Sequence, residues 1–346
     1  MTALPTATGA APVAGADHGT PAADARRDRV DVHHHYTAPE WIDWAERNGV
    51  VRREKLPPWT RWSLDDALAL MDGAGVRTSV LTVAMLGRLQ EPKARKESAH
   101  VALRAAGDLV REHPDRFAFY APVFLDSPEL SLWSIRHGLD ELGAVGVSAR
   151  TSVRGVYLGH PSQDAILAEL NERSAVISTH PMEVPGGDAD LEGVPPFLCD
   201  FLMDTTRAAL SLIVNGTLDR YPNLTFILPH GGGFLPYIAS RLEVFGHHLS
   251  PPVEPARVRD CLHRFYYDTA GPMSPSATPS LLAAVGPERI LFGSDWPPTP
   301  AALVTGVTAP AFDQDPALDG EQRRRINRDN AHRLLPALAA AATGSV

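Results

Sequence analysis

Short apolar runs alternate with longer stretches of helical periodicity from Arg29 to the end of the chain. The apolar runs are nearly continuous, which predicts parallel strands that are buried on both faces of a sheet. There are eight: Val30–His35, Thr78–Ala84, Phe117–Phe124, Ala144–Ala149, Ala175–His180, Leu224–His230, Phe265–Thr269 and Ile290–Asp295. Between them, apolar residues recur with the period of an amphipathic helix. The helical stretches are Leu64–Ala74, Lys93–Glu112, Ser162–Arg173, Thr205–Arg220 and Leu235–Phe245.

Eight strand–helix units without a break in composition predict one α/β domain, a single (β/α)8 TIM-type barrel with its active site at the C-terminal face. The alternative is an open doubly wound sheet. Such sheets carry a glycine-rich turn after the first strand, where this chain has histidines instead. We expect the barrel to occupy residues 28–346, with residues 321–341 as a terminal helix. Residues 1–27 are rich in Ala, Pro, Gly and Thr, and we expect a disordered tail there.

Three long connections follow predicted strands: Tyr36–Ser63, Pro181–Leu198 and Gly246–His263. In a barrel, such connections cover the face on which active sites lie. The first connection holds four of the chain's 6 tryptophans, namely Trp41, Trp44, Trp59 and Trp62. They predict either an apolar lid over a pocket or a loop packed on the barrel rim, and the sequence leaves both open.

Composition excludes several classes of partner. The net charge is −9 without a basic stripe, which argues against binding to nucleic acid or to an anionic membrane. The chain has no run of 18 apolar residues, so the sequence predicts no membrane span. The N-terminal residues lack the basic start and apolar core of a signal peptide, and we expect a cytoplasmic protein. The two cysteines, Cys199 and Cys261, predict packed thiols and no disulfide framework.

Histidines end the first predicted strand, in the run His33-His34-His35. Residues two apart on a strand share a face, so His33 and His35 can converge on one ion while His34 points the other way. An exposed polar tract, a fragment of an engineered tag or core histidines are the alternatives. The triplet ends an apolar strand and does not follow a terminal linker, which favours a metal site.

Three other predicted strands also end in groups that can bind a metal: His180, His230 and Asp295. Each alone is a weak signal, but the ends of parallel barrel strands meet at one rim. Imidazoles and a carboxylate suit Zn²⁺, with Mn²⁺ as the alternative. We therefore predict one divalent ion bound by His33, His35, His180 and Asp295. His230 exceeds what one ion needs, and the three glycines that follow it let a substrate approach closely, so we expect it to act as a general base.

The sequence favours one metal ion over two. Binuclear barrels of this type use a carboxylated lysine or a glutamate at the end of the fourth strand, but Ala144–Arg150 contains neither an acid nor a lysine. No lysine follows Lys96. The remaining histidines lie in predicted helices or loops and are not expected to be ligands; among them are His113, His160, His247, His248, His263 and His332.

With these residues, the chain closely resembles the amidohydrolase superfamily over about Arg29 to Leu335. Within it, the chain resembles the branch of aminocarboxymuconate-semialdehyde, γ-resorcylate and 6-methylsalicylate decarboxylases. The most specific motif is His230-Gly231-Gly232-Gly233-Phe234-Leu235-Pro236, followed by Arg241. The other carriers are Asp31-Val32-His33-His34-His35, Met71-Asp72-Gly73-Ala74-Gly75-Val76, Thr179-His180-Pro181 and Leu291-Phe292-Gly293-Ser294-Asp295.

The resemblance implies a carbon–carbon lyase, a metal-dependent non-oxidative decarboxylase of a small aromatic or unsaturated carboxylic acid. It implies the same four metal ligands, and acid/base roles for His230 and Asp295. Arg241 falls where the family has an arginine that reaches the substrate carboxylate of the neighbouring subunit, which implies a homodimer; a surface salt bridge is the alternative. A second arginine that binds substrate is expected after the first strand. Arg61 lies near that position, and Arg47, Arg52 and Arg53 compete with it.

Other reactions could use the same residues. A metal ion that activates water would also hydrolyse a lactone, an ester or an amide, and the ligand set does not separate this reaction from decarboxylation. An isomerising protein or a metal-binding scaffold without catalysis is the third alternative. In the decarboxylase interpretation, the ring carbon must be protonated, or its double bond saturated, before the bond to the carboxylate breaks.

Overall fold

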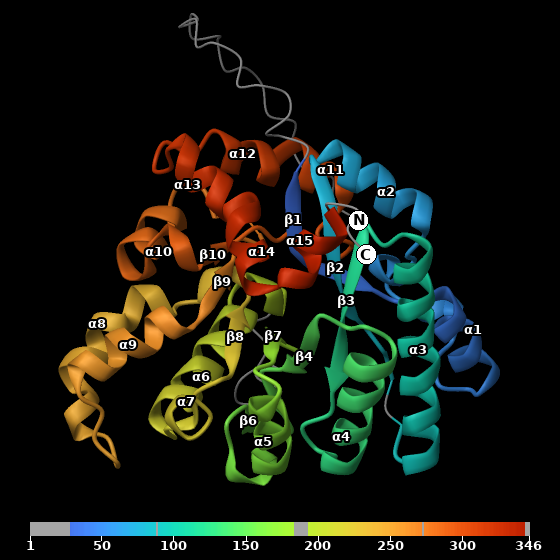
Figure 1. Ribbon diagram of the computed structural model, residues 1–346, viewed down its shortest axis with the longest axis horizontal. Helices are drawn as coiled ribbons and strands as arrows, with labels where there is room; N and C mark the ends of the chain where they lie inside the picture. Colours follow the sequence, from blue (N-terminus) through green and yellow to red (C-terminus); the bar gives the residue numbers. More distant parts are fainter. Residues whose placement is uncertain (1–27, 88, 183–192, 272, 343–346) are drawn as a thin grey trace, which may run out of the picture.

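Eight parallel strands form the centre of the molecule in the computed structural model, which describes residues 28–87, 89–182, 193–271 and 273–342 (Figure 1). They are hydrogen-bonded in the order β1-β2-β3-β4-β7-β8-β9-β10, so each strand lies beside the next one along the chain. Their bounds are β1 Arg29–Tyr36, β2 Val76–Val83, β3 Phe117–Val123, β4 Gly146–Arg150, β7 Val176–His180, β8 Thr225–Leu228, β9 Tyr266–Asp268 and β10 Ile290–Leu291. A separate antiparallel pair consists of β5 Ser152–Val153 and β6 Val156–Tyr157.

The last strand returns to the first, which closes the barrel. β10 itself is short, but the chain continues beside β1 after it ends. The N–H of Val32 donates to the carbonyl of Phe292 at 3.0 Å, and the N–H of Asp295 donates to the carbonyl of His33 at 2.9 Å. The N–H of His35 then donates to the carbonyl of Trp296 at 2.7 Å. The prediction of a (β/α)8 barrel is therefore confirmed, and the open sheet is excluded.

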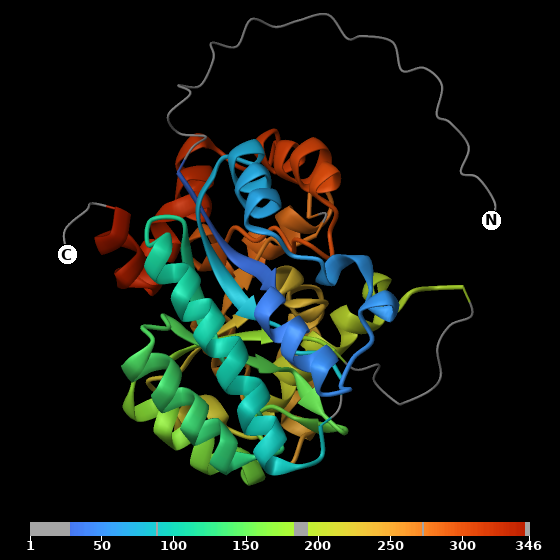
Figure 2. The same ribbon diagram turned by 90° about the vertical axis from the view of Figure 1, so that its right-hand side faces the viewer.

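Helices surround the strands on their outer side (Figure 1). In Figure 2 the long helix α3 crosses the front of the barrel, with α1 beside it. The helices are α1 Pro39–Arg47, α2 Leu64–Gly73, α3 Pro92–Glu112, α4 Pro128–Arg136, α5 Asp164–Glu172, α6 Asp200–Val214, α7 Thr217–Arg220, α8 Leu235–Phe245, α9 Pro255–Arg264, α10 Ala277–Val285, α11 Ala301–Leu303, α12 Ala309–Asp313, α13 Gly320–Arg324, α14 Asn330–Leu334 and α15 Pro336–Ala342.

The strands bury apolar side chains on both of their faces. Inside the barrel, one cluster includes Val32, Tyr120 and Val176. Between the strands and the helices, a second and larger cluster includes Phe119 and Ile177. Neighbours along a strand thus belong to different clusters, because successive side chains point to opposite faces. This double burial is the reason why the strands were visible in the sequence as continuous apolar runs.

Two of the predicted long connections contain helices. α1 follows β1 directly, and α9 occupies much of the predicted connection Gly246–His263. Both begin with a proline at the first helical position, where the missing N–H costs no hydrogen bond. Both are amphipathic but short, of 9 and 10 residues, so each pattern spans fewer than three helical turns and does not stand out within a long connection. Part of the predicted connection Pro181–Leu198 and the predicted tail 1–27 lie outside the described residues.

Two predicted helices are divided. α6 begins five residues earlier than expected, and Gly216, whose φ of 65° is left-handed, separates it from α7. The predicted terminal helix 321–341 is helical from α13 through a π-helical segment to α14, and then breaks at Leu335. Pro336 follows the break and starts α15, because the residue before a proline disfavours the helical conformation. Of the described helices, none is both long and apolar enough to cross a membrane.

Three of the four tryptophans in the first connection pack on the barrel rim. Trp41 and Trp44 lie on α1, and their indole N–H groups donate to Ser98 Oγ at 2.8 Å and to Glu97 Oε1 at 3.0 Å on α3. Trp62 is 7% exposed and is itself part of the outer core. The interpretation as a packed rim therefore describes these three. Trp59 differs, because its half-buried ring lies 6.5 Å from the ring of His35.

Candidate metal centre

The two outer histidines of the triplet on β1 point toward the same place, as predicted. His33 Nε2 and His35 Nε2 lie 3.1 Å apart, and both rings are buried. His34 turns away and is fully buried. Its ring packs edge-on against Trp296, and the indole N–H of Trp62 donates to its Nε2 at 3.3 Å. The alternation along β1 thus presents two imidazoles to the barrel mouth and one to the surrounding core.

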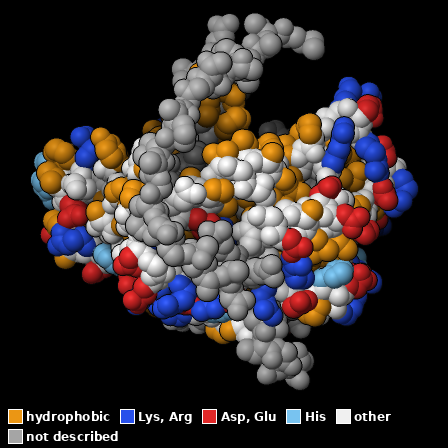
Figure 3. Space-filling model, turned by 90° about the horizontal axis from the view of Figure 1, so that it is seen from above, with side chains coloured by type: hydrophobic (Ala, Val, Ile, Leu, Met, Phe, Trp, Pro, Cys, Tyr) orange, Lys and Arg blue, Asp and Glu red, His pale blue; other side chains and the backbone are white. Residues whose placement is uncertain are grey.

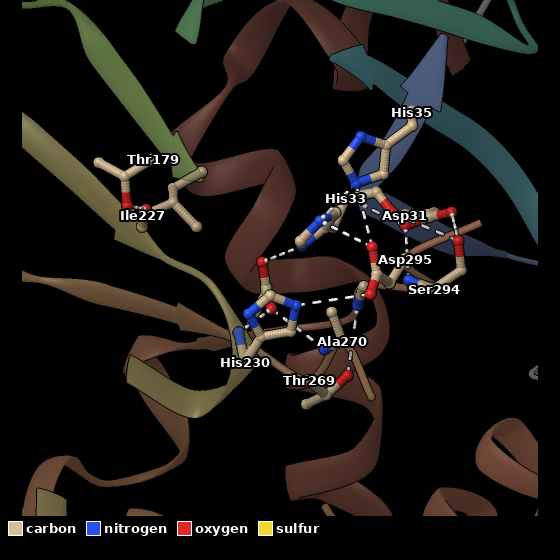
Figure 4. Close-up of polar contacts among 12 residues, drawn as sticks. Asp31, His33, His35, Thr179, Ile227, His230, Thr269, Ala270, Ser294 and Asp295 are labelled. Atoms are coloured by element: carbon tan, nitrogen blue, oxygen red, sulfur yellow. Dashed lines mark hydrogen bonds and ion pairs between the residues drawn. The ribbon is translucent and has the colours of Figure 1, made fainter. Parts of the chain in front are cut away.

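The groups at the other strand ends reach the same point. The ring of His180, at the end of β7, lies 4.6 Å from that of His35, and the ring of His230 lies 5.3 Å from that of His33. Asp295 Oδ1 is 3.0 Å from His35 Nε2, and Asp295 Oδ2 is 3.5 Å from His230 Nε2. Figure 4 shows four of these side chains close together, namely His33 and His35 of β1, His230 after β8 and Asp295 after β10. The structure therefore brings all five predicted residues together.

Within the described residues, one group has ligand atoms close enough to hold a metal ion. It consists of His33, His180, His230 and Asp295, whose ligand atoms all lie within 4.8 Å of one another. The group includes His230, which the sequence analysis placed beside the ion, and omits His35, which it placed among the ligands. His35 nonetheless contacts both His33 and Asp295 directly. The geometry thus supports a metal site while it leaves two imidazoles as competitors for one position.

The surroundings of the site shift the pKa values of His33 and His180 in opposite directions. Burial lowers the pKa of His33, but the carboxylates of Asp268 and Asp295 outweigh burial and raise it well above its usual value. Burial and the neighbouring histidines hold the pKa of His180 well below its usual value. Burial raises the pKa of Asp295, but contacts with His33, His230 and His35 outweigh it and lower that pKa strongly. The ionised carboxylate of Asp295 beside the neutral imidazole of His180 is a pair of donors that suits a divalent cation.

Two residues of the site have strained backbones. His230 has a φ of 55° and Asp295 a φ of 58°, a left-handed conformation that is uncommon for residues other than glycine. Such strain persists only where surrounding bonds hold it, and it is concentrated at functional sites. The N–H of Asp295 donates to the carbonyl of His33, and the N–H of His230 donates to Asp268 Oδ1 at 2.8 Å. These bonds fix both side chains toward the site.

Two buried carboxylates next to the site were not among the predicted site residues. Asp268 ends β9, and its Oδ2 lies 2.8 Å from His33 Nδ1. Asp31 lies on β1 and accepts the N–H and the hydroxyl of Ser294 at 3.0 and 2.6 Å, which ties β1 to the segment after β10. The signal for Asp268 was present, since it is an acid at the end of a predicted strand, as is Asp295. Asp31 gave no such signal.

The residues present fit a divalent ion. Nδ1 of His180 and Nδ1 of His230 are buried and lack a hydrogen-bond partner among the described residues, although both rings lie beside the site. β4 runs next to β7, with Arg150 paired to His180, and it adds no acid or lysine. The structure thus has the donors for one ion and lacks, on β4, the bridging group that a second ion would use.

The predicted arginines lie at the surface. Arg241, on α8, is exposed and its guanidinium carbon lies 5.6 Å from the centre of the Phe245 ring. Its alternative role in a salt bridge finds no acidic partner within the described ranges. Arg61 is exposed and follows the short 3-10 turn that carries Trp59. Of its competitors, Arg53 is tied to Asp43 and to Glu46.

Comparison with known proteins agrees with this geometry. The sequence profile of the amidohydrolase family matches residues 30–337. The chain belongs to the amidohydrolase family. One relative in the family, the 6-methylsalicylic acid decarboxylase of Aspergillus aculeatus, is 30% identical over 92% of this chain and 99% of its own length. The expected family is thereby confirmed.

Solved structures of similar proteins share the fold. The crystal structure of an amidohydrolase II has a TM-score of 0.80 at 27% identity, and the match covers 89% of this chain and 100% of that one. A dihydroxybenzoic acid decarboxylase from a Polaromonas species, solved with bound manganese and the inhibitor 2-nitroresorcinol, has a TM-score of 0.74 at 23% identity. That match covers 90% of this chain and 97% of the other, and at this identity it supports the fold.

Proposed function

We propose that this enzyme is a metal-dependent, non-oxidative decarboxylase of a small aromatic carboxylic acid of the salicylate type. The observation that carries the proposal is the convergence of four imidazoles and Asp295 at the mouth of a barrel whose relatives include a 6-methylsalicylic acid decarboxylase. Muconate-type acids are the other substrates to consider. Hydrolysis of a lactone, ester or amide would use the same residues, but no feature of the site favours it over decarboxylation.

The ion is held by His33, His35, His180 and Asp295 in this proposal. Zn²⁺ suits the imidazole-rich set best, and Mn²⁺ is the alternative, because manganese is bound in the dihydroxybenzoic acid decarboxylase. A divalent ion there would supply Lewis-acid polarisation and hold the substrate's carboxylate and a neighbouring oxygen. The low pKa of His180 supports its role, since a neutral imidazole presents a free lone pair.

His230 and Asp295 serve as the acid/base pair. When CO₂ leaves, the bond between the ring and the carboxylate breaks, and the ring carbon must hold a proton in its place. His230 Nε2 lies 3.5 Å from Asp295 Oδ2, so a proton can pass between the two groups at the edge of the site. The side chain of His230 is 14% exposed, whereas that of His33 is 5% exposed, which leaves His230 the more accessible to a substrate.

A second copy of the chain completes the site in this proposal. Large apolar side chains on and near α8 are exposed: Phe197, Leu198, Met203, Tyr237, Val244 and Phe245. Figure 3 shows apolar side chains at the left-hand edge of the molecule, the side on which α8 lies in Figure 1. Exposed apolar surface of this kind is typical of protein interfaces. Arg241 lies among these residues, where it could enter the site of a partner and bind the substrate carboxylate bidentately.

Two finer points complete the proposal. Arg61 is our choice for the substrate-binding arginine of the first connection, because it follows Trp59, whose ring is next to His35. The cytoplasmic location expected from the sequence stays a prediction.

The direct test is CO₂ release. Metal-loaded protein should release CO₂ from 6-methylsalicylate or a related 2-hydroxybenzoate, with the phenol as product, and should do so more slowly after chelation. A panel of muconate-type acids and of lactones, assayed side by side, separates the alternatives. Hydrolysis of a lactone without release of CO₂ from any acid would overturn the decarboxylase proposal in favour of the hydrolase.

A further inference from the structure

Asp268 makes more bonds to the site than any role considered so far explains. It is 2% exposed, and each of its carboxylate oxygens has a separate task. Oδ2 lies 2.8 Å from His33 Nδ1, while Oδ1 accepts the N–H of His230 at 2.8 Å and that of Ala270 at 3.0 Å. One side chain thereby contacts a proposed metal ligand and the backbone of the proposed acid/base residue.

The fold places Asp268 there through the alternation along β9. Tyr266 belongs to the inner cluster and Tyr267 to the outer one, so Asp268 again faces inward, at the end of the strand. Gly293 leaves room for the contact between His33 and Asp268. A Cβ atom at Gly293 would lie 2.9 Å from His33 Cβ and 3.3 Å from Asp268 Cβ, so a larger residue would press on both.

The contact with His33 determines where the proton of that imidazole lies. A carboxylate can only accept, so Nδ1 of a neutral His33 must carry the hydrogen, and Nε2 keeps its lone pair. Nε2 is the atom that faces His35 and Asp295, at 3.1 and 3.3 Å. The same carboxylate accepts the N–H of His230, whose backbone is left-handed and needs such a bond to stay so.

We propose that Asp268 is the positioning residue of the site. It holds His33 with Nε2 ready for the metal ion and holds the backbone of His230 in its strained conformation. Bonds of this kind behind a metal-binding histidine raise its affinity for the ion by about 10–100-fold. The proposal rests on the metal site of the proposed function but does not depend on which reaction the site performs.

The substitution Asp268→Asn separates the two tasks. The amide oxygen can still accept the N–H groups of His230 and Ala270, but the amide nitrogen now faces His33 Nδ1 and donates to it. The hydrogen of His33 must then move to Nε2, where it blocks the lone pair. Asp268→Ala removes both tasks. Asp315→Asn is the matched control, because Asp315 is 1% exposed and bonded to Ser274 and to the N–H of Ala317 away from the site.

The experiment measures Zn²⁺ affinity by competition with a chromogenic chelator, together with thermal unfolding. The ¹⁵N shifts of the His33 ring are followed in metal-free protein up to alkaline pH, where the imidazole is neutral, because the nearby carboxylates raise its pKa. Asp268→Asn should weaken Zn²⁺ binding by about 10–100-fold, with the hydrogen found on Nε2 and little loss of stability. Asp268→Ala should lose both affinity and stability. Asp315→Asn should keep the wild-type affinity for Zn²⁺ at a similarly small cost in stability.

Three outcomes would overturn the proposal. They are wild-type affinity in Asp268→Asn, a hydrogen that stays on Nδ1 in that variant, or an equal loss of affinity in Asp315→Asn. A parallel assay of CO₂ release from the wild type keeps this test distinct from that of the proposed function. If the wild type binds Zn²⁺ and loses it in Asp268→Asn yet decarboxylates nothing, the positioning role stands and the decarboxylase proposal fails.

Discussion

Asp295 is the residue on which the contacts of the site converge. Its Oδ1 lies 3.3 Å from His33 Nε2 and 3.0 Å from His35 Nε2, and its Oδ2 lies 3.5 Å from His230 Nε2. These contacts keep the carboxylate ionised despite its burial. Four imidazoles and an ionised acid exceed the donor set of one catalytic ion, which keeps a coordination position for water or substrate. The remaining metal ligand is therefore either His35 or His230.

A pair of alanine variants decides between the two histidines. We expect His35→Ala to lose most of its metal and, with it, its activity. His230→Ala should keep the ion and lose turnover by about 10²–10⁴-fold, the effect of removing one acid/base group. Elemental analysis of the purified variants, with kcat measured at saturating metal, checks both. The reverse pattern, in which His230→Ala loses the ion while His35→Ala retains it, would make His230 the ligand.

At the scale of elements, the turn from β8 to α8 decides how His230 enters the site. All three glycines of the turn have positive φ, and each lies against a different neighbour. The tightest is Gly233, where a Cβ atom would lie 2.2 Å from the carbonyl oxygen of Leu202 and 2.8 Å from Thr206 Oγ1 on α6. The chain therefore approaches α6 as closely as only glycine allows. The motif noted in the sequence is thus a packing requirement as well as an opening for substrate.

Gly233→Ala tests that requirement. Gly143→Ala is its matched control, because Gly143 has a φ of 74° and no atom within 4 Å of the added Cβ. The control should lose about 1 kcal/mol of unfolding free energy from the left-handed backbone alone. Gly233→Ala should lose about 1–3 kcal/mol more, since α6 must shift and since the ψ of −125° at Gly233 lies outside the left-handed helical region. Chemical denaturation of both variants measures the difference, and equal losses would mean that neither the contact with α6 nor this backbone conformation adds a cost.

On the scale of the whole molecule, one barrel holds the metal centre but carries Arg241 on an outer helix. Arg241 lies eleven positions beyond His230, about three turns of helix along the chain. The exposed apolar residues around Arg241 favour a twofold dimer in which Arg241 of each subunit enters the active site of the other. An isolated subunit would then bind the ion but would lack the arginine that binds the substrate carboxylate.

Subunit exchange tests this arrangement. Arg241→Ala and His230→Ala should each be inactive, but a dimer with one subunit of each kind has one intact composite site. After random exchange, about a quarter of wild-type activity should return, because half of the dimers are mixed and each has one active site. Sedimentation analysis establishes the dimer, and differently tagged subunits establish exchange. If exchange occurs and activity stays absent, Arg241 acts within its own subunit or has no role.

Most of the architecture could be predicted from the sequence, since strands that are buried on both faces appear as apolar runs. The C-terminal residues of such strands meet at one rim of the barrel. That rule predicted that five side chains lie together, namely His33, His35, His180, His230 and Asp295. It also separated His34 from its neighbours, because alternation along a strand is a local property. The short helices α1 and α9 were missed although both are amphipathic, since an isolated segment of two to three turns depends on tertiary packing for its stability.

The tertiary structure alone decided which atoms meet. The bond between His33 and Asp268 joins residues 235 positions apart, and it depends on the closure of β10 onto β1 with Gly293 between the two. The roles of the tryptophans were decided in the same way, by the position of α3 against α1. The sequence alone predicts which side chains lie at the C-terminal rim of the barrel, because that depends on the local period of each strand. Their mutual distances depend on barrel closure and on packing between distant segments, which no local pattern contains.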